Sequence, residues 1–100
     1  MRAAVALFTR DLRVHDNPAL RAALDAAETV LPLFVLDDGI LGTAYAAAPR
    51  VAFLHRALGD LDASLRRIGG ALAARRGDVV AETVRAARDV GAGAVFAAAD

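Results

Sequence analysis

The sequence predicts an α/β fold, a Rossmann-like doubly wound parallel sheet. Short apolar runs alternate with longer segments in which apolar residues recur every three or four positions, as strands and helices do. Each helical segment can cross back over a sheet, so successive strands should run parallel with right-handed connections. The predicted strand order is 3-2-1-4, with a fifth strand missing.

The first strand and the first helix are marked by their ends. Residues 3–8 are continuously apolar, as expected for a strand that is buried on both faces. Asn17 can accept hydrogen bonds from the free amides at a helix start, and Pro18 has no amide that needs a partner. We therefore expect the first helix over about residues 18–27.

The second strand and the long helix after it carry the strongest patterns. Residues 30–36 form an apolar strand, although Pro32 is unusual inside a strand. A loop leads to Pro49, and the Gly69-Gly70 pair ends the helix that follows. The apolar face of this helix consists of Val51, Leu54, Leu58, Leu61, Leu65 and Ile68.

The last third of the chain repeats the pattern more weakly. Residues 71–76 form a weak third strand, because alanine has a low strand propensity. A helix over about 79–90 ends at Gly91, and residues 94–98 form a fourth strand. The inner face of that helix is expected at Val80, Val84, Ala87 and Val90.

Composition excludes several classes of function. The absence of cysteine excludes a disulfide scaffold and cysteine-based zinc or redox sites. All 12 basic residues are arginine, which excludes P-loop and Schiff-base chemistry that needs a lysine. The formal net charge is zero, so the chain has no excess of positive charge that would attract DNA or an anionic membrane. Without a targeting segment or a membrane-length apolar run, we expect a soluble cytoplasmic chain with no membrane contact.

No group of catalytic or metal-binding residues stands out. His15 and His55 have no second histidine or cysteine at metal-ligand spacing, and Ser64 has no base beside it. The adjacent carboxylates of Asp37 and Asp38 have neither a third carboxylate nor a lysine to complete a phosphoreceiver pocket. We therefore predict no catalytic residue and no metal site in this chain.

Polar residues gather where the predicted strands end. Ligands of doubly wound sheets bind beyond the carboxyl ends of the strands, at the switch point. This edge would hold residues 9–11, 37–38, 75–78 and 100. A fourth strand at the end of the chain would leave one sheet edge unpaired. We therefore expect the front part of a longer protein, which as an isolated fragment self-associates through that edge.

Residues 9–20 resemble the signature near the amino terminus of the DNA photolyase/cryptochrome family. The family pattern is Phe-x-Arg-Asp-Leu-Arg-x-x-Asp-Asn-x-Ala-Leu, and this chain has Phe-Thr-Arg-Asp-Leu-Arg-Val-His-Asp-Asn-Pro-Ala-Leu from Phe8 onward. The chain departs from the family at Leu7, where an aromatic residue is usual, and at 97–99, where the family is more polar. Further stretches fit at the expected spacing, namely residues 33–37, 49–50, 76–78 and 95–96.

The resemblance implies a division of labour between two domains. In this family an amino-terminal α/β domain carries an antenna chromophore, which is a deazaflavin or a reduced folate and occasionally a flavin. A larger helical domain carries FAD, a tryptophan electron-transfer chain and the pocket for the DNA lesion. We therefore expect residues 1–100 to be an incomplete antenna domain without the FAD-binding domain. UV-damaged DNA would be a partner of the full-length protein only.

The resemblance also implies seven cofactor-binding residues, namely Arg10, Asp11, Val35, Leu36, Asp37, Arg50 and Asp100. Arg50 matches an arginine that contacts the antenna in deazaflavin-type members, and Asp100 matches an aspartate that lines the same cleft. Val35, Leu36 and Asp37, at the end of the second strand, would flank the chromophore. Arg10 and Asp11 would lie at the floor of its site. An alternative role, fixing the loop and docking it to the helical domain, applies to Arg10, Asp11, Arg13 and Asp16.

Three functions remain open at this point. The chain is expected to be the antenna-binding domain of a light-driven DNA repair photolyase (deoxyribodipyrimidine photo-lyase), which is not catalytic alone. A cryptochrome-type blue-light photoreceptor is the first alternative, because it shares the amino-terminal motifs. A stand-alone nucleotide- or flavin-binding module of similar topology is the second alternative.

Overall fold

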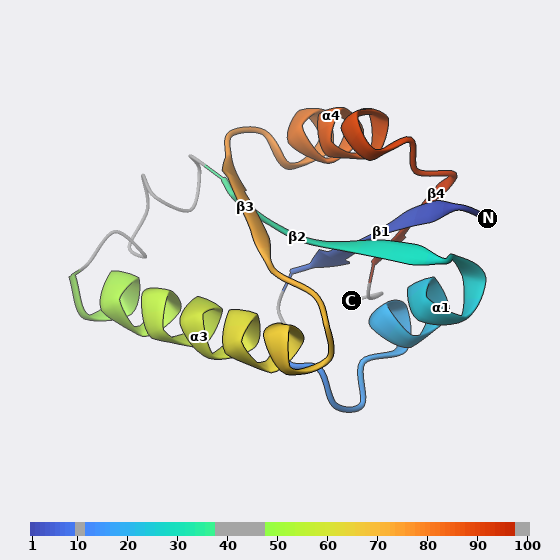
Figure 1. Ribbon diagram of the computed structural model, residues 1–100. Coiled ribbons are helices and arrows are strands. Elements are labelled where there is room, and N and C mark those ends of the chain that lie inside the picture. Colours follow the sequence, from blue (N-terminus) through green and yellow to red (C-terminus); the bar gives the residue numbers. More distant parts are fainter. Residues whose placement is uncertain (10–11, 38–47, 98–100) are drawn as a thin grey trace.

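A parallel β-sheet with helices on both faces forms the centre of the computed structural model (Figure 1). The structure describes residues 1–9, 12–37 and 48–97, with only the backbone for 48–51. Within these residues the sheet has four strands in the order β3-β2-β1-β4, as predicted. No helix in this part of the chain is long and apolar enough to cross a membrane.

The strands lie close to their predicted bounds. They are β1 (Ala3–Phe8), β2 (Thr29–Leu36), β3 (Ala73–Arg76) and β4 (Ala94–Ala97). The central strand β1 pairs in parallel with β2 on one side and with β4 on the other. Because every pair is parallel, all carboxyl ends of the strands lie at one edge of the sheet.

Three helices in the described residues connect the strands, namely α1 (Pro18–Ala26), α3 (Ala48–Arg67) and α4 (Val79–Val90). The helices α1 and α3 lie on one face of the sheet and α4 lies on the other (Figure 1). The first two connections move along the sheet in one direction and the third moves back. Right-handed crossovers therefore place α4 on the opposite face.

Side-chain and glycine caps set the helix ends where the sequence predicts them. The Asn17 Oδ1 atom accepts a hydrogen bond from the Leu20 amide at 3.1 Å. At α4 the Asp78 Oδ2 atom accepts from the Ala81 amide at 2.8 Å. Gly91 ends α4 with a φ of 65°, in the left-handed region that glycine adopts without a steric penalty.

Besides Pro18 at the start of α1, two prolines lie inside secondary structure. Pro32 is buried in β2 opposite Ala6 of β1, whereas pairing with β3 begins only at Leu33. At Pro32, β2 therefore has one neighbouring strand, which explains how a proline is tolerated there. The helix α3 begins at Ala48, slightly earlier than predicted, because Pro49 lies in the first turn, where its missing amide needs no partner.

The face covered by α1 and α3 holds the larger hydrophobic core. Leu61 and Leu65 of α3 are each 1% exposed. They pack with residues of β1, α1 and β2, namely Ala4, Ala6, Phe8, Leu20, Ala23 and Phe34. Leu12 and Val14, which lie between β1 and α1, pack against the same cluster.

The predicted inner face of α4 is wrong at Val80, Val84 and Val90, whereas Ala87 packs against the buried cluster as predicted. The helix buries Thr83 and Ala86, whereas Val80 is 71% exposed and Val84 is 43% exposed. The small Ala86 side chain packs against the larger side chains of β1 and β2, so the helix lies close to the sheet along that line. The flank of α4 next to β3 is held by ion pairs, which fix the same rotation of the helix. A prediction from hydrophobic periodicity considers only apolar side chains, so it misses the close approach at Ala86 and the ion pairs with β3.

Candidate functional site

The candidate site lies at the carboxyl edge of the sheet. The strands β1 and β2 are paired in register up to Phe8 and Phe34, and β2 continues to Leu36. The helices α1, α3 and α4 each begin after a strand that ends at this edge. The partial positive charge at the amino ends of these helices therefore faces the same side of the molecule.

The predicted site residues of β2 lie on alternate faces of the sheet. Val35 is 5% exposed and packs in the core beneath α4. Leu36 is half-buried and packs against the core on the α3 face, and the half-buried Asp37 follows the strand. The Gly77 amide donates a hydrogen bond to the Leu36 carbonyl at 2.9 Å. The end of β2 is thus tied to the turn that leads from β3 into α4.

The other predicted site residues are only partly described. The structure places the backbone of Arg50 in the first turn of α3, four positions before Leu54 and eight before Leu58. Arg10, Asp11 and Asp100 lie outside the described residues.

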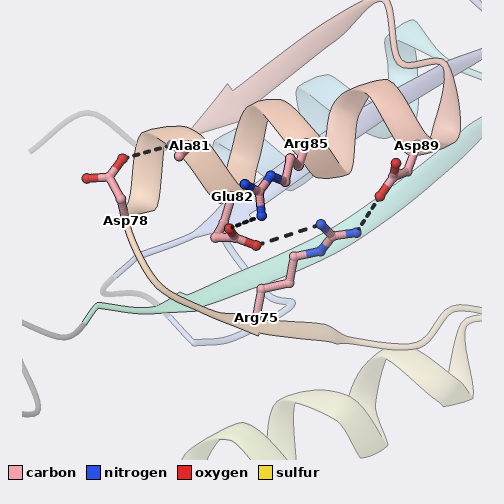
Figure 2. Close-up of polar contacts among 6 residues, drawn as sticks. All are labelled: Arg75, Asp78, Ala81, Glu82, Arg85 and Asp89. Atoms are coloured by element: carbon pink, nitrogen blue, oxygen red, sulfur yellow. Dashed lines mark hydrogen bonds and ion pairs between the residues drawn. The ribbon is translucent and has the colours of Figure 1, made fainter.

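Four charged side chains join α4 to the edge strand β3 (Figure 2). The Arg75 Nη2 atom lies 2.8 Å from Asp89 Oδ2, and its Nη1 atom lies 3.8 Å from Glu82 Oε1. The Arg85 Nη1 atom lies 3.2 Å from Glu82 Oε2. Glu82 and Asp89 are separated by two helical turns, which places both carboxylates on the same side of α4. Sequence analysis missed this network, and that spacing is the only signal of it.

The turn before α4 depends on glycine. Gly77 has a φ of 139°, which side-chain-bearing residues rarely adopt. A Cβ atom at this position would also lie 3.3 Å from the Glu82 Cγ atom. Asp78 follows directly as the N-cap of α4. The Asp78 cap and the hydrogen bond from the Gly77 amide to the Leu36 carbonyl hold the backbone of the β3–α4 turn at the carboxyl edge.

A second polar contact holds the opposite end of β3. The Asp62 Oδ1 atom accepts a hydrogen bond from the Leu72 amide at 2.9 Å, and Oδ2 accepts from Arg66 Nε at 2.9 Å. The Leu72 amide, followed by Arg66, holds the pKa of Asp62 below its ordinary value. This carboxylate joins α3 to the start of β3, away from the candidate site.

The structure also describes an open groove of about 550 Å³ beside the start of α1. Val35, Leu36 and Asp37, the predicted site residues whose side chains the structure describes, do not line it, but it adjoins the segment that carries the family signature. Its lining residues are Val14, Asp16, Asn17, Pro18, Leu20, Arg21 and Leu24. Across residues 1–9, 12–37 and 48–97, no three histidine, aspartate or glutamate residues lie together as a metal site.

The four parallel strands in the order β3-β2-β1-β4, with helices on both faces, define a Rossmann-like α/β domain. A family model described as DNA photolyase matches residues 4–100. The chain belongs to the DNA photolyase family.

Individual relatives include photolyases and a cryptochrome. The chain is 50% identical over 99 residues to deoxyribodipyrimidine photo-lyase of Streptomyces griseus, covering 99% of this chain and 22% of the relative. It is 40% identical over 102 residues to cryptochrome DASH of Natronomonas pharaonis, covering 97% and 22%. The archaeal photolyase from Sulfolobus tokodaii, solved with two FAD molecules, is 30% identical with a TM-score of 0.77, covering 95% and 22%. The chain therefore spans about a fifth of the length of these relatives.

Proposed function

We propose that this chain is the antenna-chromophore-binding domain of a light-driven DNA photolyase and that it has no repair activity by itself. The observation that carries the proposal is the 50% identity to a deoxyribodipyrimidine photo-lyase, which extends over 99% of the chain. The chain covers 22% of that relative, so the proposal assigns FAD binding and the contact with UV-damaged DNA to other parts of a full-length protein.

Two described residues at the carboxyl edge have side chains of the kind that would contact an aromatic chromophore with a polar periphery. Leu36 offers a half-buried apolar side chain, and Asp37 adds a half-buried carboxylate directly after it. By resemblance, Arg50 supplies a guanidinium group, whose planar donors suit carbonyl, carboxylate or phosphate oxygens. Arg10, Asp11 and Asp100 complete the proposed set by resemblance, and the buried Val35 would support the end of β2 from beneath.

The proposed ligand is a deazaflavin or a reduced folate, and a flavin is the third candidate. When bound, such a group would absorb light and pass the excitation to FAD. The chain's own residues would hold the chromophore in one orientation and exclude water from its buried side. The Sulfolobus tokodaii photolyase, solved with two FAD molecules, supports a flavin as the third candidate.

A cryptochrome-type photoreceptor is the second candidate function. It is favoured by the 40% identity to cryptochrome DASH over 97% of the chain. The two candidates differ in what a full-length protein does with absorbed light. Light-dependent repair of pyrimidine dimers by a full-length protein that contains this chain would favour the photolyase. Failure of that protein to repair dimers, together with a light-dependent change in its flavin spectrum, would favour the cryptochrome.

Titration of the purified chain with each chromophore tests the proposal. A deazaflavin and a reduced folate are added separately while chromophore fluorescence is followed, and we expect saturable binding of one of them. A UV-irradiated oligonucleotide is then illuminated with the loaded chain, and we expect no loss of dimers. Dimer repair by the chain alone would refute the division of labour. Binding of an adenine nucleotide with no affinity for either chromophore would favour the stand-alone nucleotide-binding module.

We also propose that the isolated chain self-associates through β4. The other edge strand, β3, carries Arg75 and Arg76, and arginines disfavour strand addition. Within the described residues β4 pairs with β1 alone and contains no charged residue, and its Val95 is 43% exposed. We expect the mass measured by light scattering to rise with concentration and a Val95→Lys variant to remain monomeric. A wild-type chain that stays monomeric at high concentration would contradict this.

The cellular location follows from the proposed partner. UV-damaged DNA is the substrate of the proposed full-length protein. We propose that the full-length protein is cytoplasmic, in a cell whose chromosome also lies in the cytoplasm. Fractionation of cells that express a tagged full-length protein tests this location. Recovery of the tag in the membrane fraction would contradict it.

A further inference from the structure

Glu82 joins the ion pairs of α4 to the turn that precedes the helix. Its side chain is 16% exposed, and its carboxylate lies between Arg75 and Arg85 (Figure 2). The same side chain lies against Gly77, because a Cβ atom added there would be 3.3 Å from Glu82 Cγ and 3.6 Å from Oε2. Glu82 therefore links β3, α4 and the turn between them.

Helix capping does not account for the contact between Glu82 and Gly77. Asp78 already caps α4 through the Ala81 amide. In a capping box the acidic residue lies three positions after the N-cap, which is Ala81 here, and Glu82 lies one position further on. The helix dipole favours an acidic side chain near a helix start, but that attraction does not require burial against the turn. The contact therefore has another role.

The turn that Glu82 contacts holds the end of β2. Pairing between β2 and β3 reaches Leu36 and Arg76. One residue further along, the Gly77 amide donates a hydrogen bond to the Leu36 carbonyl at 2.9 Å. This carbonyl belongs to the peptide group that joins Leu36 to Asp37. The position of that peptide group therefore depends on the conformation of the turn.

Glycine does not hold this conformation by itself. Gly77 has a φ of 139°, and without a side chain it reaches many other backbone conformations as readily. Contacts from neighbouring residues must therefore restrict it. Asp78 holds the helix side of the turn as the N-cap, whereas the side chain of Glu82 contacts Gly77 itself.

We propose that Glu82 is a positioning residue for the antenna site. Its side chain restricts Gly77, and the Gly77 amide then fixes the peptide group between Leu36 and Asp37. A site that is ordered before binding loses less conformational entropy when the chromophore binds. This inference rests on the proposed function, in which Leu36 and Asp37 contact the chromophore.

Hydrogen exchange of the Gly77 amide, followed by NMR, measures this restraint without a chromophore. In Glu82→Ala the contact is lost, and Gly77 should exchange about three- to tenfold faster relative to Gly93, the range for weakening one hydrogen bond. The Gly93 amide donates to the Ala3 carbonyl at 2.9 Å at the amino edge of the sheet. The ratio of the two exchange rates therefore corrects for a change in global stability. A wild-type ratio in Glu82→Ala would overturn the proposal.

An Asp89→Ala variant is the matched control. Asp89 lies two turns along the same side of α4 and contacts the Nη2 atom of Arg75 at 2.8 Å. The variant removes a carboxylate from the same ion-pair network but leaves Glu82 against Gly77, so its exchange ratio should equal that of the wild-type chain. An equal rise in Asp89→Ala and Glu82→Ala would overturn the proposal, because the restraint would then come from the network as a whole.

A Glu82→Gln variant tests rescue by a side chain of the same shape. Glutamine keeps the methylene groups that lie against Gly77 and an oxygen that accepts from Arg75. We expect the exchange ratio to return to that of the wild-type chain. A ratio as high as in Glu82→Ala would show that the charge alone matters and would overturn the role given to the contact with the turn.

A chromophore titration connects the turn to the site. Affinity for the deazaflavin or folate that the wild-type chain binds should fall about three- to tenfold in Glu82→Ala, as for one lost hydrogen bond. It should stay unchanged in Glu82→Gln and Asp89→Ala. The circular dichroism band of the bound chromophore should change in Glu82→Ala alone, because the band depends on the orientation of the ring. A raised exchange ratio with wild-type affinity and a wild-type band would overturn the positioning role.

The two claims can fail separately. A wild-type chain that binds neither chromophore contradicts the proposed function. The exchange ratio then decides the restraint alone: a raised ratio in Glu82→Ala supports the hold of Glu82 on the turn, and an unchanged ratio overturns it.

Discussion

The two faces of the sheet are held by different kinds of contact. On the α1 and α3 face, leucine and phenylalanine side chains from four elements fill one core. On the α4 face, the buried cluster is smaller and consists of Val5, Leu33, Val35 and Ala86. Ion pairs between β3 and α4 add to the second face (Figure 2).

The difference shows what fixes the orientation of a helix on a sheet. Large side chains on α3 bury themselves along one continuous stripe, so the rotation of the helix follows from their spacing. On α4 the buried residues are small, and valines on its surface stay exposed. Close approach at Ala86 and the partners of Arg75 decide the rotation there.

The largest effect is expected in the core of the α1 and α3 face. Leu61 is 1% exposed, so Leu61→Ala should lower the free energy of unfolding by about 2–5 kcal/mol, measured by urea denaturation. Leu24 lies on the same side of the sheet but is 48% exposed, and Leu24→Ala should cost less than about 1 kcal/mol. Equal losses in the two variants would show that the core is not where the structure places it.

Enlarging the small residue beneath α4 tests the rotation of that helix. Ala86 is fully buried, so Ala86→Leu should cost about 1–3 kcal/mol through overpacking. Val80→Ala should change the free energy of unfolding by less than about 0.5 kcal/mol, because Val80 is exposed. A larger loss for Val80→Ala than for Ala86→Leu would restore the inner face predicted from periodicity.

The ion pairs of α4 should contribute less to the free energy of unfolding than the hydrophobic core on either face of the sheet. Arg75→Gln removes both contacts of a side chain that is 30% exposed, and the expected loss is about 0.5–1 kcal/mol at low salt. Arg21→Gln breaks an exposed pair with Asp25 and should have no measurable effect. The loss in Arg75→Gln should shrink in 1 M salt. A salt-independent loss would show that packing of the side chain, and not its charge, matters.

The smallest effect is a change in acid sensitivity at Asp62. The pKa of Asp62 is lower in the folded chain than its ordinary value of 3.8. Its contribution to stability is therefore present above that value and is lost as the pH falls through the folded pKa. Asn at this position still accepts from the Leu72 amide but does not titrate. The urea midpoint of Asp62→Asn should fall less than that of the wild-type chain between pH ~5 and ~2, and equal falls would contradict this.

Sequence analysis predicted the strand order and most element bounds because those depend on local signals. Asn17 with Pro18 fixes the start of α1, and Asp78 and Gly91 fix the ends of α4. The order β3-β2-β1-β4 is then the one that a doubly wound parallel sheet adopts, so it followed from the fold class.

The rest depends on contacts between distant residues. The ion pair of Arg75 with Asp89 spans 14 positions, and the spacing of Glu82 and Asp89 on α4 does not indicate which residue pairs with them. The second hydrogen bond of Asn17, from Nδ2 to the Arg13 carbonyl, is local, but capping already explains an asparagine there, so the sequence gives no reason to look for it. Of the candidate site, sequence analysis placed Val35, Leu36, Asp37 and the backbone of Arg50 where the structure has them. Their roles toward a chromophore remain predictions.

We propose that the carboxyl edge of the sheet holds the antenna chromophore. Arg50 in the first turn of α3 belongs to that edge, whereas Arg56 is exposed further along the same helix. Arg50→Gln and Arg56→Gln remove the same charge, so a fluorescence titration with the chromophore that the wild-type chain binds compares the two positions. We expect affinity to fall about tenfold or more in Arg50→Gln, as for a lost charged hydrogen bond, and to stay unchanged in Arg56→Gln. Equal affinities in both variants and the wild-type chain would contradict the claim.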